Sequence, residues 1–117
     1  MEVKTDVAII GAGPAGSTLA ALLAQRGIRV LLIDRDSFPR DKVCGEFLSY
    51  DALPILDRLD ITAELDRHAA PSITRCRVVG RKTNYEFELP RAARGVSRML
   101  LDDLLFRRAL SLGAEDR

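Results

Sequence analysis

Three glycines near the N-terminus have the spacing that a bound diphosphate requires. Gly11, Gly13 and Gly16 form a G-x-G-x-x-G pattern that follows an apolar run and precedes a helical pattern. In such a turn the first glycine permits the tight bend, the second lets the backbone approach a pyrophosphate, and the third allows close packing of helix on strand. Pro14 and Ala15 begin the helix, and the free N–H groups of its first turn, from Ala15 onward, would attract phosphate. The pattern therefore predicts a dinucleotide site.

A carboxylate follows the next apolar run. Asp34 comes 18 residues after Gly16 and directly follows the run Ile28–Ile33. An acidic side chain at this position accepts hydrogen bonds from the ribose hydroxyls of adenosine, and its charge disfavours a 2′-phosphate. We therefore expect the carboxylate of Asp34 to face the same crevice as the glycine turn. The competing interpretation is a glycine-rich turn that binds nothing.

Basic side chains and a cysteine come soon after Asp34. Arg35, Arg40 and Lys42 could contact the adenosine half of a dinucleotide, although each taken singly is better explained as part of a charged loop in water. Cys44 falls in a loop that should emerge at the C-terminal edge of the sheet, where open α/β folds bind ligands. A small buried thiol is the competing interpretation of Cys44.

Other kinds of site are disfavoured. The chain has 117 residues, and its 18 Lys and Arg against 17 Asp and Glu argue against a nucleic-acid partner. One histidine, His68, and two cysteines are too few for a zinc site or a disulfide scaffold. His68 is interpreted as a surface or helix-end residue. Asp102 and Asp103 should point to different sides of a helix, so they are not expected to form a two-carboxylate acid–base site.

The location of the chain is predicted from its N-terminal region. The first residues lack the basic segment and cleavage site of a signal peptide. The run from Val7 to Gln25 carries no charge, but its glycines and proline interrupt any membrane span. We therefore expect no membrane span and a cytoplasmic, reducing location.

The elements that must position these residues follow from the apolar pattern. Thr5–Ile10 and Ile28–Ile33 are predicted as buried parallel strands, joined by a helix that ends at Gly27, so that the three form one βαβ unit. A helix capped by Ser49 is predicted to run to Leu59, and helical turns are predicted over Ile61–Ala69. A hairpin of Ile73–Val79 and Asn84–Leu89 follows, and then a connector over Pro90–Gly95. The last predicted element is a helix capped by Ser97 and ending at Gly113.

Three blocks of the sequence resemble FAD-dependent oxidoreductases of the geranylgeranyl reductase, flavin-dependent halogenase and aromatic hydroxylase (p-hydroxybenzoate hydroxylase-like) type. The first runs from Asp6 to Arg35 and is widespread among FAD enzymes. The second, residues 38–49, is similar to the F-P-R-x-K-x-C-G-x-x-L-S stretch of the reductases and halogenases. The third, residues 97–105, is similar to their R-x-x-L-D-x-x-L helix. Glu46-Phe47 replaces the Asp-Gly common in the reductases, which favours the other branches slightly.

The resemblance implies that FAD is the cofactor and that NAD(P)H is the electron donor of the full enzyme. It also assigns roles to single residues: Gly11, Gly13, Gly16 and Asp34 hold the ADP half, Arg35 lies beside the adenine ribose, Arg98 reaches toward the pyrophosphate or ribityl chain, and Cys44 and Gly45 sit close to the isoalloxazine ring. Cys44 is thereby the candidate catalytic residue. No metal ligands are expected.

The predicted fold class is α/β, a Rossmann-like βαβ FAD-binding unit with a β-hairpin that belongs to a substrate-domain sheet, incomplete at the C-terminus. The chain is interpreted as the N-terminal portion of an FAD-binding domain, with residues 1–70 and 95–117 as the dinucleotide-binding part and 71–94 as the hairpin. A third parallel strand should begin at Ala114-Glu115. Because only two residues follow, we expect the second strand to be an open sheet edge that permits self-association.

The predicted function is the FAD-binding N-terminal part of a flavin-dependent oxidoreductase of the reductase, monooxygenase or halogenase type. Such a part is not expected to be catalytically complete alone. The alternatives are a non-catalytic module that binds ADP or NAD, and one half of a split flavoprotein. The block of residues 38–49 favours flavin over NAD.

Overall fold

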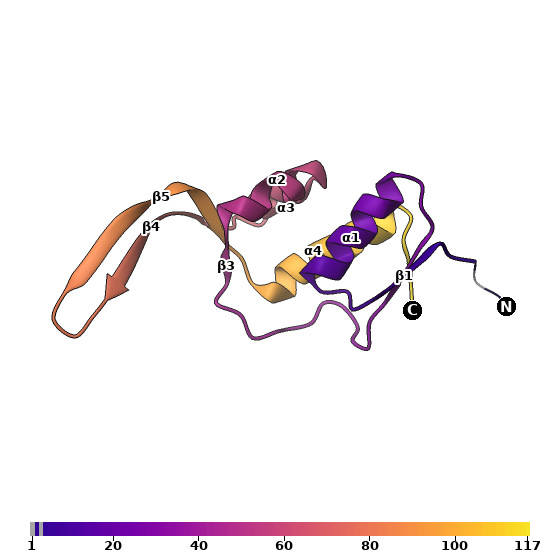
Figure 1. Cartoon of the computed structure of the whole chain (residues 1–117), viewed down its shortest axis with the longest axis horizontal. Coiled ribbons are helices and arrows are strands. Elements are labelled where there is room, and N and C mark those ends of the chain that lie inside the picture. The colour runs from indigo at the N-terminus through magenta and orange to yellow at the C-terminus, as the bar shows by residue number, and fades with distance from the viewer. Residues whose placement is uncertain (1, 3) are drawn as a thin grey trace.

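The computed structural model describes residue 2 and residues 4–117, and it contains two sheets with helices between them (Figure 1). The first sheet consists of β1 (Val7–Ile10), β2 (Val30–Ile33) and β6 (Glu115–Asp116). The second consists of β3 (Phe47–Leu48), β4 (Ser72–Val79) and β5 (Asn84–Gly95). The helices are α1 (Pro14–Gln25), a 3-10 turn at Tyr50–Ala52, α2 (Leu53–Arg58), α3 (Ile61–Arg67) and α4 (Arg98–Ser111).

The first sheet is parallel throughout, with β2 in the centre. Val7 pairs with Val30 in the β1–β2 ladder, and Leu31 pairs with Glu115 in the β2–β6 ladder. The predicted βαβ unit is confirmed, and the third strand starts where it was expected. The prediction that the second strand is an open edge is wrong. Two residues suffice to extend the ladder because the N–H of Arg117 also donates to the carbonyl of Leu32, at 3.1 Å.

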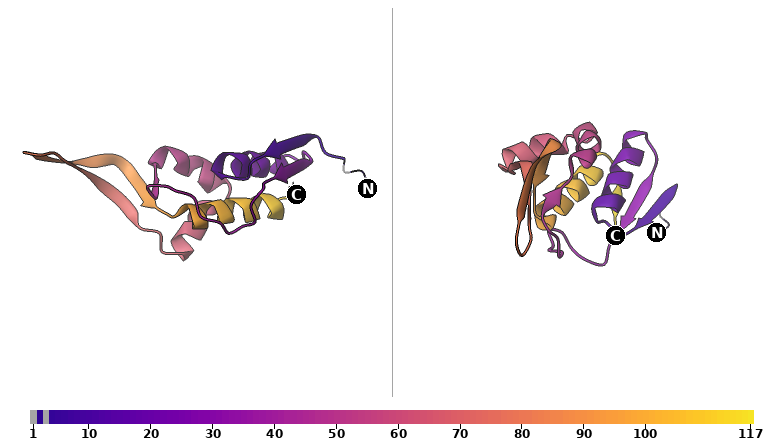
Figure 2. Two further views of the ribbon diagram at one scale, coloured as in Figure 1. Left: turned by 90° about the horizontal axis from the view of Figure 1, so that it is seen from below. Right: turned by 60° about the vertical axis from the view of Figure 1, so that its left-hand side comes forward.

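Helices α1 and α4 lie side by side and pack on one face of this sheet (Figure 2). Their contact is close because α1 presents alanines where it meets α4, and Ala20 and Ala21 are fully buried. Leu105 of α4 and Leu32 of β2 complete the same apolar cluster. This arrangement fixes the start of α4 beside the start of α1, since each helix leads into a parallel strand of the same sheet, α1 into β2 and α4 into β6.

The hairpin of β4 and β5 projects from the body as a long arm, with the short β3 paired to its base (Figures 1 and 2). The predicted connector over Pro90–Gly95 is wrong, because these residues continue β5. A register shift explains the error. Ile73 pairs with Ala93 while Arg75 pairs with Glu88, so β5 carries extra residues here, including Pro90. Proline lacks the N–H that a ladder needs, and a bulge tolerates its absence.

Two predicted helix starts are confirmed by their caps. The hydroxyl of Ser97 accepts a hydrogen bond from the N–H of Leu100 at 3.2 Å, where α4 begins. The hydroxyl of Ser49 accepts from the N–H of Asp51, although it caps the 3-10 turn that precedes α2. Among the residues that the structure describes, no helix is long and apolar enough to cross a membrane.

Candidate functional site

The glycine turn joins β1 to α1 and has a backbone that only glycine fits easily. Gly11 has a φ of +102°, in the region that L side chains rarely adopt, and its N–H donates to the carbonyl of Ile33 at 2.7 Å. A Cβ on Gly16 would overlap the carbonyl oxygen of Gly11. The turn therefore closes on itself, and α1 begins directly behind it with Pro14 in its first turn.

Gly13 lies at the N-cap of α1 and faces two arginines. A Cβ at this position would be 3.7 Å from Nη2 of Arg98 and 3.9 Å from Nη2 of Arg40. The backbone N–H groups of the first turn of α1 are also at this end of the helix, where the helix dipole favours negative charge. The missing side chain of Gly13 thus leaves space between a helix N-terminus and two guanidinium groups.

Asp34 ends β2 with its carboxylate turned to the glycine turn, as the sequence predicted. Its Oδ2 accepts from the N–H of Ala12 at 2.7 Å, and its Oδ1 accepts from the N–H of Asp36 at 2.9 Å. Burial of this carboxyl favours its neutral form, but the N–H groups of Asp36 and Ala12 and the nearby guanidinium of Arg40 together hold the pKa of Asp34 below its usual value. The group is therefore ionised at neutral pH.

The interpretation of Arg40 as part of a charged loop in water is wrong. Its side chain is only 11% exposed and lies 2.8 Å from Asp102, with Asp36 at 3.4 Å and Asp34 at 3.6 Å. The guanidinium also stacks on the ring of Phe38, at 4.6 Å from its centroid. The loop after β2 thus folds back over α4 and carries a buried cation with it.

The neighbouring cations Arg35 and Lys42 are different. The side chain of Arg35 is 84% exposed and reaches Asp36 only at 4.0 Å. Lys42 is partly exposed and lies 3.7 Å from the same carboxylate. The structure therefore brings Arg40 into the site and leaves these two side chains at its rim.

Arg98 and Asp102 form a two-pronged ion pair along α4. Nε of Arg98 donates to Oδ1 of Asp102 at 2.7 Å, and Nη2 donates to Oδ2 at 3.0 Å. The carboxylate of Asp102 is completely buried, and its hydrogen bond to Arg98 raises the pKa of that guanidinium. Asp103 points to the other side of the helix, as predicted, and pairs with Arg107. The burial of Asp102 was not predicted, although its i, i+4 spacing from Arg98 was a usable signal.

Cys44 and Gly45 lie in the loop before β3. Cys44 is exposed, so the interpretation as a buried thiol is wrong. The N–H of Glu46 donates to its sulfur at 3.3 Å. The negative charge of a thiolate at Cys44 would add to the raised pKa of Arg98, after the larger effect of Asp102. A Cβ on Gly45 would meet no atom within 4 Å. The loop is therefore open beside the arginines.

Two hollows adjoin the end of β2, and Asp34, Arg35 and Asp36 line both. One, of about 400 Å³, extends to Gly11, Arg40 and Lys42. The other, of about 320 Å³, lies toward Phe38, Phe106 and the end of β6. The carboxylate of Asp34 thus stands between two spaces at the C-terminal edge of the sheet, where α/β folds take their ligands.

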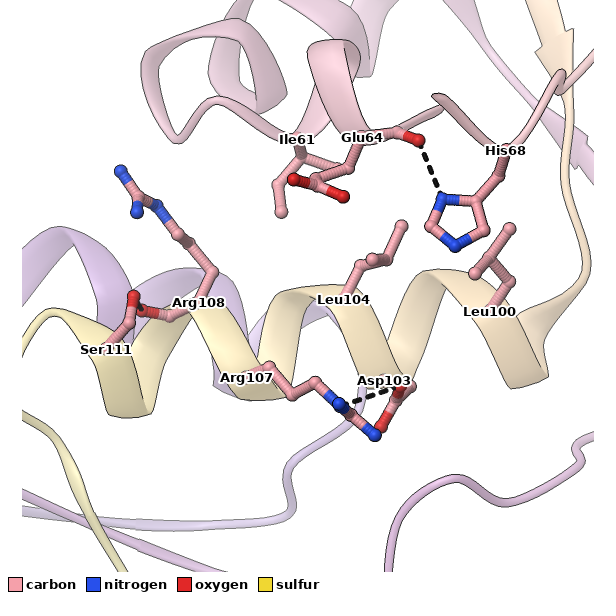
Figure 3. A pocket seen from close by; sticks show the side chains of 9 residues that line it. All are labelled: Ile61, Glu64, His68, Leu100, Asp103, Leu104, Arg107, Arg108 and Ser111. Carbon is pink, nitrogen blue, oxygen red and sulfur yellow. Dashed lines mark hydrogen bonds and ion pairs between the residues drawn. The ribbon is translucent and has the colours of Figure 1, made fainter. Parts of the chain in front are cut away.

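A larger hollow of about 520 Å³ lies between α3 and α4 (Figure 3). Figure 3 shows His68 there, with its Nδ1 2.8 Å from the carbonyl oxygen of Glu64. His68 ends α3, in agreement with its prediction as a helix-end residue. None of the predicted cofactor-binding residues lines this hollow.

A parallel βαβ unit with a glycine turn and an acidic residue at the end of its second strand defines a dinucleotide-binding fold of the Rossmann type. Comparison of the sequence with family profiles gives the finer assignment. The profile of the FAD binding domain matches residues 4–115, so the chain belongs to this family of flavoproteins, whose cofactor is FAD. Its resemblance to FAD-dependent oxidoreductases is thereby confirmed.

Individual relatives include reductases and halogenases. A menaquinone reductase of Mycobacterium tuberculosis is 37% identical over 117 residues, covering 97% of this chain and 29% of that protein. The 1H-pyrrole-2-carbonyl-(peptidyl-carrier protein) brominase of Pseudoalteromonas luteoviolacea is 38% identical over 112 residues, covering 94% of this chain and 27% of the brominase. This chain therefore spans less than a third of the length of these relatives.

Solved structures show the same arrangement. The flavin-dependent brominase Bmp2 superposes with a TM-score of 0.86 at 31% identity, over 97% of this chain and 29% of the brominase. The myxobacterial chondrochloren halogenase CndH also gives 0.86, at 32% identity, over 97% of this chain and 28% of the halogenase. The predicted fold class is confirmed by these neighbours, which contain both the parallel unit and the antiparallel sheet.

Proposed function

We propose that the glycine turn, with Gly11, Gly13 and Gly16, and Asp34 bind the ADP half of FAD. The observation that carries this proposal is the space at Gly13, which a side chain would occupy and which two guanidinium groups and the start of α1 border. A diphosphate is the part of FAD with the charge and the acceptor oxygens for such a space. The residues present therefore fit the cofactor of the family.

Each remaining contact follows from the groups at this edge of the sheet. A carboxylate has about four acceptor positions, and Asp34 uses two of them for backbone N–H groups. The others would accept from the ribose hydroxyls beside Nη2 of Arg40, which lies 3.6 Å from Oδ2, and the negative charge would repel a 2′-phosphate. Arg35, at the rim, would lie beside the adenine ribose, and Arg98 would donate to the diphosphate. Pro14 and Ala15 contribute the first turn of α1, whose N–H groups point to the same place.

The loop with Cys44 and Gly45 is proposed to lie beside the isoalloxazine ring. Its support is the exposure of Cys44 in the loop that leads into β3. The flavin, when bound, supplies the electron transfer, and the protein orients it and limits access to it. Cys44 would act there on the environment of the ring. Its role is tested in a complete, flavin-loaded enzyme that contains this segment, where Cys44→Ser should change turnover or product pattern more than flavin content.

For the whole protein we propose a flavin-dependent reductase, monooxygenase or halogenase that takes electrons from NAD(P)H. Support comes from the relatives, which are named as menaquinone reductases and halogenases. A cytoplasmic location is supported by the free state of Cys44 and Cys76. Self-association is proposed through the edges of β1 and β6, because β2 is paired on both sides.

The experiment is a titration of the chain with FAD, ADP and NAD. We expect FAD and ADP to bind wild type and Gly13→Ala to bind neither, because the new methyl group takes the place of the diphosphate. The variant should keep its fold, since the distances to Arg98 and Arg40 are ordinary contacts. Gly80→Ala, in the hairpin turn, is the matched control and should bind like wild type. Equal affinity of wild type and Gly13→Ala for ADP would contradict the proposal, and a preference for NAD over FAD would favour the NAD module.

A further inference from the structure

The two arginines at Gly13 are close enough to each other to repel. Both have an Nη2 atom within 4 Å of the position of a Cβ on Gly13, at 3.7 Å for Arg98 and 3.9 Å for Arg40. The two residues are far apart in the sequence and come from different elements, the loop after β2 and the start of α4. Some group must therefore hold these like charges together before any ligand arrives.

The group that both arginines share is the carboxylate of Asp102, while Arg40 alone also pairs with Asp34 and Asp36. Its Oδ2 accepts from Nη1 of Arg40 at 2.8 Å and from Nη2 of Arg98 at 3.0 Å, and its Oδ1 accepts from Nε of Arg98 at 2.7 Å. One fully buried carboxylate thus takes three charge-assisted hydrogen bonds and faces two cations. These bonds use Nη1 of Arg40 and both Nε and Nη2 of Arg98. Other N–H groups of both guanidinium groups remain to donate to a ligand.

The orientation of Arg40 is fixed from its other side by aromatic rings. Its guanidinium stacks on Phe38, and Phe38 stacks on Phe106 of α4 with ring centroids 4.4 Å apart. Its Nε is buried without a hydrogen bond, and the carboxylate of Asp36 lies 3.4 Å from it in an ion pair only. Among the described residues no ring stacks on Arg98, and its position depends on Asp102.

Resting on the proposed FAD site, we infer that Asp102 is a positioning residue that holds Arg40 and Arg98 as a pair of donors to the diphosphate. Arg40 is then a second phosphate-binding arginine beside Arg98. Asp102 touches no ligand itself, because it is buried beneath both guanidinium groups. Its removal should weaken the binding of the diphosphate and leave the binding of adenosine unchanged, since the ribose contact belongs to Asp34.

The test compares two ligands that differ only in the diphosphate. The chain is titrated with ADP and with adenosine, and dissociation constants are taken from NMR chemical shifts, which also report weak binding. For Asp102→Asn we expect the dissociation constant of ADP to rise about tenfold or more and that of adenosine to change less than about twofold. Asp103→Asn is the matched control, because that carboxylate lies next in the sequence and pairs with Arg107 outside the site. It should leave both constants unchanged.

A second measurement separates positioning from a general effect on the fold. In the double variant Arg40→Met/Arg98→Met, adding Asp102→Asn should cause no further loss of ADP affinity, because the groups on which it acts are gone. Should Asp102→Asn alone fail to fold, Arg40→Lys takes its place. Lysine keeps the charge without the second donor that reaches Gly13, so ADP affinity should fall while adenosine affinity stays.

The outcomes distinguish this inference from the proposed function. Wild-type chain that binds neither ADP nor FAD would contradict the proposed site. The positioning role would be overturned if the wild-type chain binds ADP but Asp102→Asn, or its substitute, weakens the binding of ADP and adenosine equally or weakens neither. The FAD site would then remain in place.

Discussion

The parallel-sheet body (β1, β2 and β6 with α1 and α4) and the hairpin arm (residues 74–89) differ in what surrounds their side chains. In the body, Leu32 and Leu105 are buried completely or nearly so by the other sheet strands and helices. In the arm, Val79 is 71% exposed and Tyr85 is 67% exposed. Both regions satisfy their backbone hydrogen bonds, but only the body also buries apolar surface. The backbone hydrogen bonds of β4 and β5 therefore lengthen the arm, but they do not give it a hydrophobic core.

The arm also determines the shape of the molecule, and the candidate dinucleotide site lies in the body. The chain measures 64 × 25 × 22 Å, and its radius of gyration is 16.7 Å. A compact chain of this length would have about 13 Å, and the arm accounts for the difference (Figure 1). Every group assigned to the diphosphate and the ribose belongs to the body or to the loops fixed on it. Precise contacts to a ligand need side chains that packing holds still.

The largest expected effect comes from adding one methyl group to a glycine of the body. Gly16→Ala should lower the free energy of unfolding by at least about 3 kcal/mol, because the Cβ would overlap the carbonyl of Gly11 and the backbone must move. Urea unfolding followed by circular dichroism measures it. Gly80→Ala is the same change in the arm, where the Cβ would lie 3.1 Å from the carbonyl oxygen of Thr83 and the hairpin turn need shift only slightly, so it should cost only about 1 kcal/mol. Similar losses for the two variants would remove the distinction between the regions.

The next effect tests the joint between the regions. Arg94, near the base of the arm, pairs with Asp66 of α3 and donates to the carbonyl of Ala70, both at 2.8 Å. Arg94→Met should cost about 1–3 kcal/mol, since the part-buried carbonyl of Ala70 loses its charged donor. Hydrogen exchange should show faster exchange in β4 and β5 and unchanged exchange in β1 and β2. Arg91→Met, at an exposed pair with Asp51, is the control and should have little effect.

A smaller effect depends on pH and belongs to the body alone. The pKa of Asp34 is lowered in the folded chain, so its ionised form stabilises the fold fully above its usual value of 3.8, and this contribution is lost as the pH falls through the folded-state pKa. Asp34→Asn should therefore cost on the order of 1 kcal/mol at neutral pH, with a gap to wild type that closes in acid. Unfolding curves across this range measure the gap. A gap that is constant with pH would contradict the ionic role of Asp34.

The smallest effect is expected on the exposed face of the arm. Val79→Thr keeps the branched shape that a strand favours and should change the free energy of unfolding by less than about 0.5 kcal/mol. Thermal unfolding of the chain is the measurement. A loss comparable to that of a buried residue would show that this side chain is covered in solution, for example by a second copy of the chain.

The parts of this structure that could be predicted are those whose signal is local. The glycine turn, the position of Asp34 and the cap of Ser97 each depend on residues within one turn or one strand, and each lies where the sequence placed it. The strand at residues 90–95 could not be predicted in this way. Pro90 normally marks the end of a strand, and only the register of the partner strand creates the bulge that accepts it.

The role of Arg40 depends on contacts that no local pattern encodes. Its partner Asp102 is 62 residues away along the chain, and its stacking on Phe38 requires the ring of Phe106 behind it. Polar residues in a turn-rich segment usually lie in water, so the burial of Arg40 becomes visible only once α4 is in place. Asp102 is similar, because its spacing to Arg98 is also that of an ordinary surface ion pair on a helix.

The central position of β2 has a consequence for the order in which the sheet assembles. Joining β1 to β2 brings Val7 to Val30, whereas joining β2 to β6 brings Leu31 to Glu115, a loop roughly four times as long. Closing the longer loop costs about 1 kcal/mol more chain entropy, and β6 offers only two residues in return. The βαβ unit with the glycine turn should therefore form early. β6 should join only after α4 has docked on α1, because the loop that remains to be closed is then shorter.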